Sequence, residues 1–472
     1  MSLIAEVTDG IGRAFETAQA RTEAALFQPT VRLGVTGLSR AGKTVFITSL
    51  VANLLSPGRM PQFRAAADGR LLTSFLQPQP DDGLARFAYE DHRASLLGPE
   101  PVWPEGTKQI SQLRLSLRIR PTGFLTGMTG PRTVHLDIVD YPGEWLLDLP
   151  LMGQTYEEWS QASLTLARSD ARAEVAAPWL AAAGAVAEQA AFEESPAQAL
   201  ARAFTGYLRA AREAGFSGCA PGRFLLPGEM EGSPALTFAP LPVGTGEGGL
   251  RREFARRYDA YRRIVVKPFF RDHFSRIDRQ IVLVDALGAI AAGPLAVEDL
   301  RVAMADILQA FRPGKNSWLS RLTGKRVEKI AFAATKADHL HHTQHQALAG
   351  IMDALLDDAR RRAAYKGAAT KSFAIAALRA TVEQEIAHKG ETLPCVRGRL
   401  PGGRDAALYA GDLPEDPAVL LAPARQGAER WLQADYELMD FQPPTTALSP
   451  GEGPPHIRLD RAVEFLIGDR LL

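Results

Sequence analysis

The residues best equipped for chemistry form the run GLSRAGKT at positions 37–44. The spacing of its glycines, lysine and threonine is that of a phosphate-binding loop. Such a loop turns backbone N–H groups toward phosphate oxygens, and the helix that follows adds the partial positive charge of its N-terminus. Lys43 would reach the β- and γ-phosphates, and the Thr44 hydroxyl would take one Mg²⁺ position. The expected nucleotide contacts are Gly37, Ser39, Arg40, Ala41, Gly42, Lys43, Thr44 and Val45.

Two further signals suit the γ-phosphate end of a nucleotide. The motif D-x-x-G occupies positions 140–143, after an apolar run. Asp140 would hold Mg²⁺, usually through water, and the Gly143 N–H would approach the γ-phosphate. Thr107 lies on a loop before another expected strand, where its hydroxyl would join the Mg²⁺ ligands only while a γ-phosphate is present. These residues predict loops that respond to the state of the nucleotide.

A third pair of signals suits a guanine base. Asp338, in the motif T-K-x-D, would accept hydrogen bonds from guanine N1–H and N2–H₂, which adenine cannot supply. Lys336 would lay its stem along the base. The motif usually begins with Asn, and Thr335 stands there instead, so base specificity is less firmly indicated. Ala376 and Ala377, after a later strand, would present a backbone N–H to guanine O6.

The elements that must hold these motifs can be read from the apolar runs and helical periodicities. Buried strands are expected at 31–36, 112–119, 134–139, 281–284, 329–334 and 371–375. Helices are expected at 45–55, 83–97, 154–176, 178–193, 196–214, 250–277, 295–311, 344–365 and 459–471. This order predicts an α/β three-layer P-loop NTPase fold of the GTPase type, with a mostly parallel sheet and a large α-helical insertion.

The chain divides by the same reading into three parts. Residues 1–144 and 281–392 are expected to form the core that binds the nucleotide, and residues 145–280 a mainly α-helical insertion. Residues 393–472 are punctuated by Pro and Gly and are expected to be irregular, with a closing helix.

Composition limits the partners and the compartment. The 472 residues carry a formal net charge of zero, which argues against sequence-specific nucleic acid as a partner. Cys219 and Cys395 are far apart and form no metal or redox motif, so we expect reduced thiols in the cytosol. We expect neither a signal peptide nor a membrane-spanning run.

Three segments leave a surface contact open. Residues 1–27 have the spacing of an amphipathic helix, which we expect to pack on the protein rather than on a membrane. The helix at 250–277 is rich in Arg and aromatic residues, and acid-paired arginines are favoured over a partner surface. The basic loop at 313–329, with Trp318, would suit an anionic surface.

Taken together, these motifs resemble those of the YcjX-like family of P-loop GTPases. The resemblance rests on GLSRAGKT at 37–44, WPEGT at 103–107, DYPGEW at 140–145, ATKAD at 334–338 and PPHIRLDR at 454–461. It extends over essentially the whole chain. It implies a TRAFAC-like core that hydrolyses GTP with Mg²⁺ and switches loops with the nucleotide. It also implies a stress-associated protein of the bacterial cytoplasm, with peripheral contact at the inner membrane left open.

One departure concerns catalysis. Glu144 follows D-x-x-G, where many Ras-like enzymes have a Gln that orients the attacking water. A carboxylate is repelled by the γ-phosphate and cannot donate to it, so we expect slow hydrolysis. Arg40 either neutralises phosphate charge or, in the alternative interpretation, points to solvent or pairs with an acid. The expected catalytic residues are Lys43, Thr107, Gly143, Glu144 and Arg40.

Two alternatives remain open from the sequence. One is an ATPase or nucleotide kinase with the same phosphate loop, against which the T-K-x-D motif argues. The other is a nucleotide-stabilised adaptor with negligible turnover. The GTPase interpretation expects an unidentified protein partner or activating factor to contact the insertion, and the adaptor would dock a partner or membrane through the insertion and the basic loops.

Overall fold

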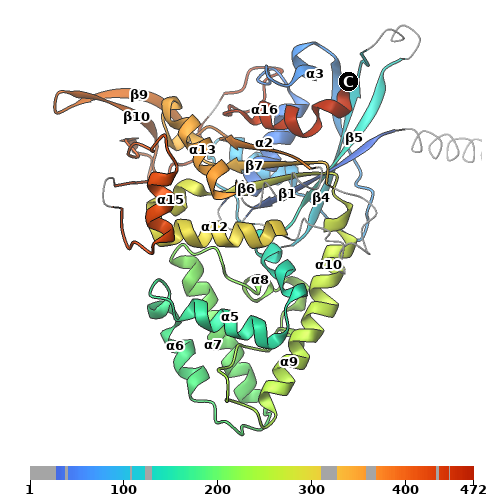
Figure 1. Cartoon of the computed structure of the whole chain (residues 1–472). Coiled ribbons are helices and arrows are strands. Elements are labelled where there is room, and N and C mark those ends of the chain that lie inside the picture. Colours follow the sequence, from blue (N-terminus) through green and yellow to red (C-terminus); the bar gives the residue numbers. More distant parts are fainter. Residues whose placement is uncertain are drawn as a thin grey trace, which may run out of the picture.

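A computed structural model describes residues 28–37, 41–106, 109–122, 130–309, 327–357, 368–431, 435–445 and 447–472. In this part of the chain, an eight-stranded sheet has the order β2-β4-β5-β1-β6-β7-β8, with β3 beside β4 (Figure 1). The strands are β1 (Thr30–Gly37), β2 (Leu71–Gln77), β3 (Ala85–Arg86), β4 (Ser111–Ile119), β5 (Arg132–Asp140), β6 (Arg279–Val284), β7 (Lys329–Ala334) and β8 (Ala369–Ala374). From β5 to β8 the pairing is parallel, whereas β4 is antiparallel to both β5 and β2. The six strands expected from the sequence are therefore confirmed.

Side chains of the central strands point alternately to the two faces of the sheet, and helices pack on both faces, which makes three layers. In β6, Ile281 and Leu283 belong to one apolar cluster and Val282 and Val284 to the other, because successive strand residues point to opposite faces. The first cluster includes residues of α2 (Lys43–Leu55) and α16 (Leu459–Ile467). The second includes residues of α11 (Ala286–Ala292), α12 (Pro294–Gln309) and α13 (His345–Leu355). Burial on both sides explains why these strands read as nearly continuous apolar runs.

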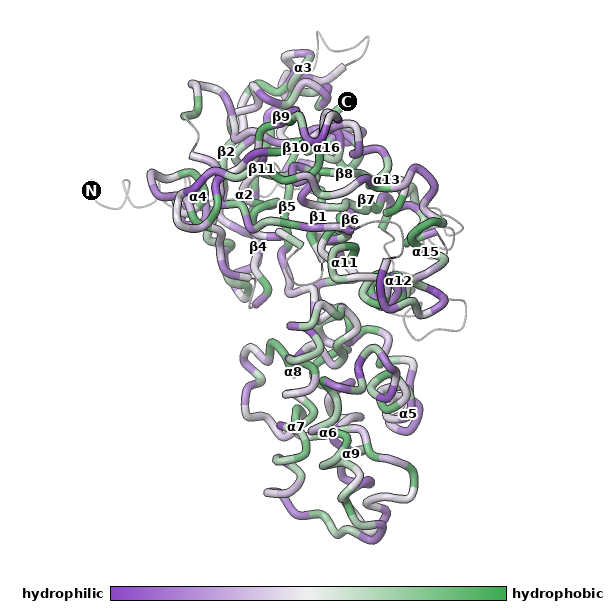
Figure 2. Tube along the Cα trace, turned by 90° about the vertical axis from the view of Figure 1, so that its left-hand side faces the viewer, coloured by the Kyte–Doolittle hydropathy of each residue, from purple (hydrophilic) through white to green (hydrophobic). Residues whose placement is uncertain are grey.

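The connection from β5 to β6 forms the helical insertion, a lobe below the sheet in Figure 2. It begins with the 3₁₀ helix η1 (Gly143–Gly153) and continues through α5 (Tyr156–Ala167), α6 (Ala173–Gly184), α7 (Glu194–Glu213), α8 (Gly222–Leu225), α9 (Leu250–Tyr261), the π-helical turn Arg262–Val266 and α10 (Lys267–Asp272). Its core is aromatic. Trp159 stacks on Tyr258 with ring centroids 5.1 Å apart, and Trp179 stacks on Tyr207 at the same separation. These large rings belong to the same apolar cluster as Val282 and Val284 of β6, so the core of the lobe is continuous with one face of the sheet.

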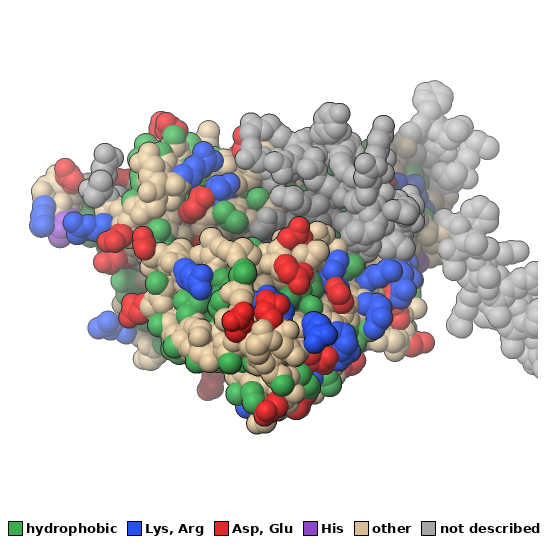
Figure 3. Space-filling model, turned by 60° about the horizontal axis from the view of Figure 1, so that its bottom comes forward, with side chains coloured by type: hydrophobic (Ala, Val, Ile, Leu, Met, Phe, Trp, Pro, Cys, Tyr) green, Lys and Arg blue, Asp and Glu red, His purple; other side chains and the backbone are tan. Residues whose placement is uncertain are grey.

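The basic helix is paired with acids, as the sequence analysis favoured. Arg257 is 4% exposed and contacts both Glu194 and Glu253, and Arg256 also contacts Glu253. The end of the insertion that faces the viewer in Figure 3 carries acidic and basic side chains intermixed. Arg257 therefore ties α9 to Glu194 at the start of α7, whereas Arg256 pairs within α9.

After β8 the chain is more regular than the sequence suggested. A second, antiparallel sheet contains β9 (Thr381–His388), β10 (Glu391–Arg399) and β11 (Asp405–Leu408), and α15 (Ala418–Arg425) follows. Most residues of β9 are at least partly exposed, so they show no apolar alternation. The turn between β9 and β10 is a two-residue hairpin turn, because Lys389 and Gly390 have positive φ angles of 50° and 87°. The glycine at its second position is the one local signal of this hairpin in the sequence.

The remaining expected elements agree only partly with the structure. The short α3 (Arg64–Ala67) and β2 lie between 56 and 82, where the sequence analysis assigned no element. Strand β3 occupies the start of the helix expected at 83–97, so α4 (Tyr89–Leu97) starts later than expected. The closing helix is α16, extended by a 3₁₀ turn. The helix expected at 1–27 and most of the basic loop at 313–329 lie outside the described residues. No helix among those described is long and apolar enough to cross a membrane.

Candidate functional site

The predicted motifs meet because they follow parallel strands of one sheet. The phosphate loop follows β1, Asp140 ends β5, Thr335 follows β7, and Ala376 follows β8. The carboxyl ends of parallel neighbours lie at the same edge of a sheet, and ligands of open α/β sheets bind there. The register agrees, since Val35 near the end of β1 pairs with Asp140.

A cavity of about 480 Å³ lies at this edge. Its lining includes the predicted residues Ala41, Gly42, Lys43, Thr44, Val45, Thr335, Lys336, Asp338, Ala376 and Ala377. Phosphate-loop residues and T-K-x-D residues thus line one continuous space. Its volume is in the range of small-molecule pockets, about 300–1,000 Å³.

Two glycines allow the phosphate loop its shape. Gly42 has a φ angle of 76°, in the left-handed region that other residues rarely adopt. A Cβ at Gly37 would lie 2.5 Å from the carbonyl oxygen of Leu283, so the loop could not leave β1 so close to β6. Lys43 is 8% exposed, and its ammonium donates to the carbonyl oxygen of Gly37 at 3.1 Å. Ser39 and Arg40 lie outside the described residues.

Two of the residues expected to supply oxygen ligands to Mg²⁺ lie on α2 and at the end of β5. Thr44 lies in the first turn of α2 and lines the cavity, and Asp140 is 2% exposed at the end of the neighbouring strand β5. A hydroxyl and a carboxylate on adjacent elements are the oxygen ligands that Mg²⁺ prefers. Thr44 and Asp140 are residue types that suit the ion, and of the two only Thr44 lines the cavity. Thr107 lies outside the described part of the chain.

The base end of the cavity is held by hydrogen bonds that the sequence did not reveal. Asp338 accepts from the Ala380 N–H at 2.8 Å through Oδ2. Lys336 has a φ angle of 60°, and its ammonium contacts Asp285 Oδ2 at 2.5 Å. The left-handed backbone at Lys336 is a strained conformation of the kind found at functional sites. The Thr335 hydroxyl donates to the Val284 carbonyl, which ties the start of the motif to β6.

The structure corrects one predicted contact. The Ala376 N–H donates to the carbonyl oxygen of Ile457 at 3.1 Å, and the Ile457 N–H returns the bond to Ala376 at 2.8 Å. The Ala376 N–H is therefore engaged inside the protein, and Ala377 is the better candidate for guanine O6. The sequence could not reveal this bridge, because Ile457 is far away in the chain.

Distant segments supply walls that the sequence analysis did not assign. Trp103 donates from its indole N–H to the carbonyl oxygen of Phe441 at 2.7 Å, although 338 positions separate the two residues. The further lining residues are Phe46, Trp103, Pro104, Glu105, Gly106, Arg212, His339, Leu378, Asp440 and Phe441. The loop before β4 and the C-terminal segment thus close the cavity together.

Arg212 is the lining residue that comes from the insertion. It lies near the end of α7, and one guanidinium nitrogen is 3.6 Å from Glu144 Oε1. Glu144 is only 5% exposed. The carboxylate that replaces the usual Gln therefore faces a positive charge, which the sequence analysis did not foresee.

The segment after D-x-x-G is anchored in the insertion. The Gly222 N–H donates to Asp148 Oδ1 at 2.8 Å, and any Cβ at Gly222 would collide with the Glu144 carbonyl oxygen. Trp145 donates to the Leu226 carbonyl oxygen, and Arg223 lies over its ring at 3.1 Å from the centroid. A shift of Gly143 and Glu144 would therefore be passed directly to α8.

This junction predicts a specific pH dependence of stability. Burial raises the pKa of the Asp148 carboxyl from 3.8 to about 6, so the folded protein binds the proton more tightly than the unfolded chain. The contribution of this group to stability is complete below pH 3.8 and is lost as the pH rises through 6. Two pKa units correspond to about 3 kcal/mol. We expect Asp148→Asn, which can still accept from Gly222, to gain stability relative to wild type by about that amount between pH 4 and pH 7.

Urea unfolding of both proteins at several pH values measures this difference. Comparing the two proteins cancels the titration of the other carboxylates. A difference in unfolding free energy that does not change with pH would contradict the prediction.

The fold and the cavity at its sheet edge are those of an α/β protein of the P-loop NTPase type. Comparison with known proteins gives the family. The model of the YcjX-like family, DUF463, matches residues 31–471. The chain is 39% identical to a protein of Escherichia coli (strain K12) named Ras-like GTPase YcjX, over 93% of this chain and 96% of that protein. It is 34% identical to a protein of the same name from Shewanella oneidensis (strain MR-1), over 93% and 94% respectively. The chain belongs to the YcjX-like family.

Proposed function

We propose that this protein binds GTP and hydrolyses it to GDP and phosphate, and that the reaction controls the position of the helical insertion. The observation that carries the proposal is the shared cavity. Lys43 and Thr44, suited to phosphates and Mg²⁺, line the same space as Lys336 and Asp338, suited to guanine. The names of the two relatives support a GTPase.

The chain's own residues account for binding and for charge stabilisation. Asp338 and the Ala377 N–H select guanine, Lys43 and the loop N–H groups hold the phosphates, and Gly143 donates to the γ-phosphate. Water attacks the γ-phosphate in line, and the reaction depends on positioning and electrostatics because the protein forms no covalent bond. Thr44, Asp140 and Thr107 would hold Mg²⁺, which would supply further neutralisation of the phosphate charge.

Arg212 is the residue of the insertion best placed to act on this reaction. Arg212 lines the cavity, and its guanidinium faces Glu144, next to the D-x-x-G motif. An arginine supplied by the same chain stabilises transition-state charge in related enzymes. We expect Arg212→Ala to lower kcat for GTP about 10- to 100-fold with little change in KM. Phosphate release under saturating GTP measures the effect, and Arg209→Ala, on an exposed position of the same helix, is the control.

A second comparison separates two roles for Arg212. If the guanidinium only neutralises Glu144, Arg212→Ala introduced into Glu144→Gln causes no further loss of rate. We expect a further loss, because the guanidinium also acts on the phosphates. Equal rates for the two proteins would contradict a direct role.

The insertion is the proposed output of the switch. Release of the γ-phosphate frees Gly143 and Thr107, and η1 carries the movement into α8 through Glu144 and Asp148. An activating protein at the insertion and the family's stress-associated, cytoplasmic setting belong to this proposal. Proteolysis patterns that are identical with GDP and with a non-hydrolysable GTP analogue would contradict the movement.

Competition with fluorescent GDP tests the function. The expected result is displacement by GTP and GDP far better than by ATP, together with slow phosphate release that requires Mg²⁺. Equal displacement by ATP would favour the ATPase alternative. Guanine-specific binding without any phosphate release would favour the adaptor.

A further inference from the structure

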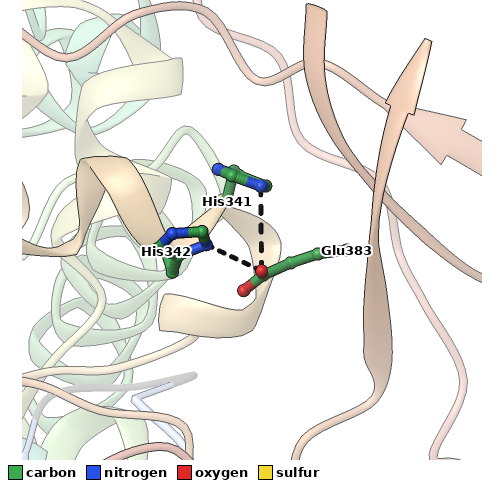
Figure 4. Close-up of side chains that lie close together, drawn as sticks. All are labelled: His341, His342 and Glu383. Carbon is green, nitrogen blue, oxygen red and sulfur yellow. Dashed lines mark hydrogen bonds and ion pairs between the residues drawn. The ribbon is translucent and has the colours of Figure 1, made fainter.

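A separate cluster of side chains lies beside the base end of the cavity. His341 and His342 come from the turn after Asp338, and Glu383 comes from β9 (Figure 4). Within the described residues, they are the one group of three or more His, Cys, Asp or Glu whose ligand atoms all lie within 4.8 Å of one another. Neither the proposed GTP reaction nor the family resemblance uses these residues.

We propose that His341, His342 and Glu383 bind a divalent transition-metal ion of the Zn²⁺ type. Two imidazoles and one carboxylate form a ligand set found in zinc sites that keep an open fourth position. Mg²⁺ and Ca²⁺ prefer ligand sets made of oxygen, so the two imidazoles select against them.

The distances suit such an ion after small adjustments. One carboxylate oxygen, Oε2 of Glu383, is 2.8 Å from His342 Nδ1 and 3.7 Å from His341 Nε2. With metal bonds of about 2.0–2.2 Å, a tetrahedral angle separates two ligand atoms by about 3.4 Å. The two observed distances bracket this value. Opening the shorter separation by about 0.6 Å and closing the longer one by about 0.3 Å would therefore admit the ion.

Neighbouring residues orient the side chains that would bind the metal. His341 is 8% exposed, and its Nδ1 is 3.0 Å from the Thr343 hydroxyl, which would hold the Nδ1–H and leave Nε2 for the metal. Arg379 lies 3.6 Å from the other oxygen of Glu383, Oε1, and so orients the carboxylate without occupying Oε2. The side chain of His342 is 63% exposed, which provides an entry path and a solvent-facing coordination position.

A metal ion at this cluster would affect nucleotide binding, an inference that rests on the proposed guanine site. The segments that the ion would join also meet at Asp338. The Ala380 N–H donates to Asp338 Oδ2, and the Thr381 hydroxyl donates to the Asp338 carbonyl oxygen. Fixing Glu383 to His341 and His342 would hold these donors in place. Metal binding therefore tightens guanine nucleotide binding, and by linkage the nucleotide tightens metal binding to the same extent.

Titration of the untagged, nucleotide-free protein with Co²⁺ and Zn²⁺ tests the site without using activity. We expect one Co²⁺ per chain, visible absorption bands typical of low coordination number, and their loss when Zn²⁺ is added. His342→Ala and Glu383→Gln should each lower Zn²⁺ affinity at least about 10- to 100-fold, the loss that even an outer-shell change causes. Both side chains are at least partly exposed, so the variants should fold. His388→Ala, at an exposed histidine of the same strand, is the control.

Zn²⁺ binding that is absent, or equal in wild type, His342→Ala and Glu383→Gln, would overturn the site. The coupling is measured separately, as the affinity for fluorescent GDP in excess Mg²⁺ with and without Zn²⁺. We expect Zn²⁺ to tighten binding at least about 5-fold in wild type and to have no effect in His342→Ala. Metal binding without this change would overturn the coupling alone. Failure to bind guanine nucleotide would contradict the proposed function, while the Co²⁺ spectrum would still decide the site.

Discussion

Asp338→Asn is expected to lower the preference of the protein for GTP over ATP by about 10²- to 10⁴-fold, because two charge-assisted hydrogen bonds are worth about 1.5–3 kcal/mol each. The Asn oxygen can still accept from Ala380, which would turn its NH₂ group toward the base. An NH₂ group cannot accept from guanine N1–H or N2–H₂. The loss therefore comes from mismatched donors rather than from a disturbed fold. Competition of GTP and ATP with fluorescent GDP measures it.

The same substitution offers a gain of function as a control. Xanthine carries a carbonyl group where guanine carries its N2 amino group, so it can accept from the new Asn NH₂. Xanthosine triphosphate should compete better than GTP for Asp338→Asn and worse than GTP for the wild type. A variant that keeps its GTP preference would show that Asp338 does not read the base.

Lys43→Met is expected to lower GTP affinity at least about 100-fold and to abolish measurable phosphate release, because a buried ammonium that contacts phosphates contributes several charge-assisted hydrogen bonds of about 1.5–3 kcal/mol each. Lys43 is buried and donates to Gly37, so its stem is already confined within the loop. Met keeps the apolar volume of this stem and removes the charge. Calorimetry and phosphate release measure the two effects.

Lys371→Met is the control, because it also removes one lysine charge, at an exposed position of β8. Thermal unfolding of both variants checks that the fold is kept. Phosphate release by Lys43→Met at the wild-type rate would exclude Lys43 from the reaction and would place hydrolysis elsewhere or in a contaminant.

Some of the site could be predicted because local patterns determine it. The phosphate loop, Asp140 and T-K-x-D each follow or end a buried strand, and such strands show themselves as short apolar runs, whereas β8, before Ala376, is buried only at its end. Parallel pairing then brings their carboxyl ends to one edge. Residues that sequence separates by hundreds of positions could thus be assigned to one pocket. The guanine and Mg²⁺ roles of these residues stay predictions that the variants above test.

Neither the second sheet nor the hydrogen bonds between Ala376 and Ile457 could be predicted from such local patterns. β9 is mostly exposed, and apolar alternation appears only where one face of a strand is buried. The bridge between Ala376 and Ile457 depends on how the C-terminal segment returns to the sheet. A backbone hydrogen bond across such a span leaves no trace in side-chain type.

The amino-acid sequence by itself determined the α/β phosphate-loop fold, the helical nature of the insertion and the set of motifs at the sheet edge, because these depend on contacts between near neighbours and on strand periodicity. Only the tertiary structure decided that Arg212 faces Glu144, that Trp103 and Phe441 close the cavity, and that His341, His342 and Glu383 converge. Each of these contacts joins segments whose meeting depends on the packing of whole elements. A charged or aromatic side chain looks the same in a sequence whether it meets solvent, an acid or a nucleotide.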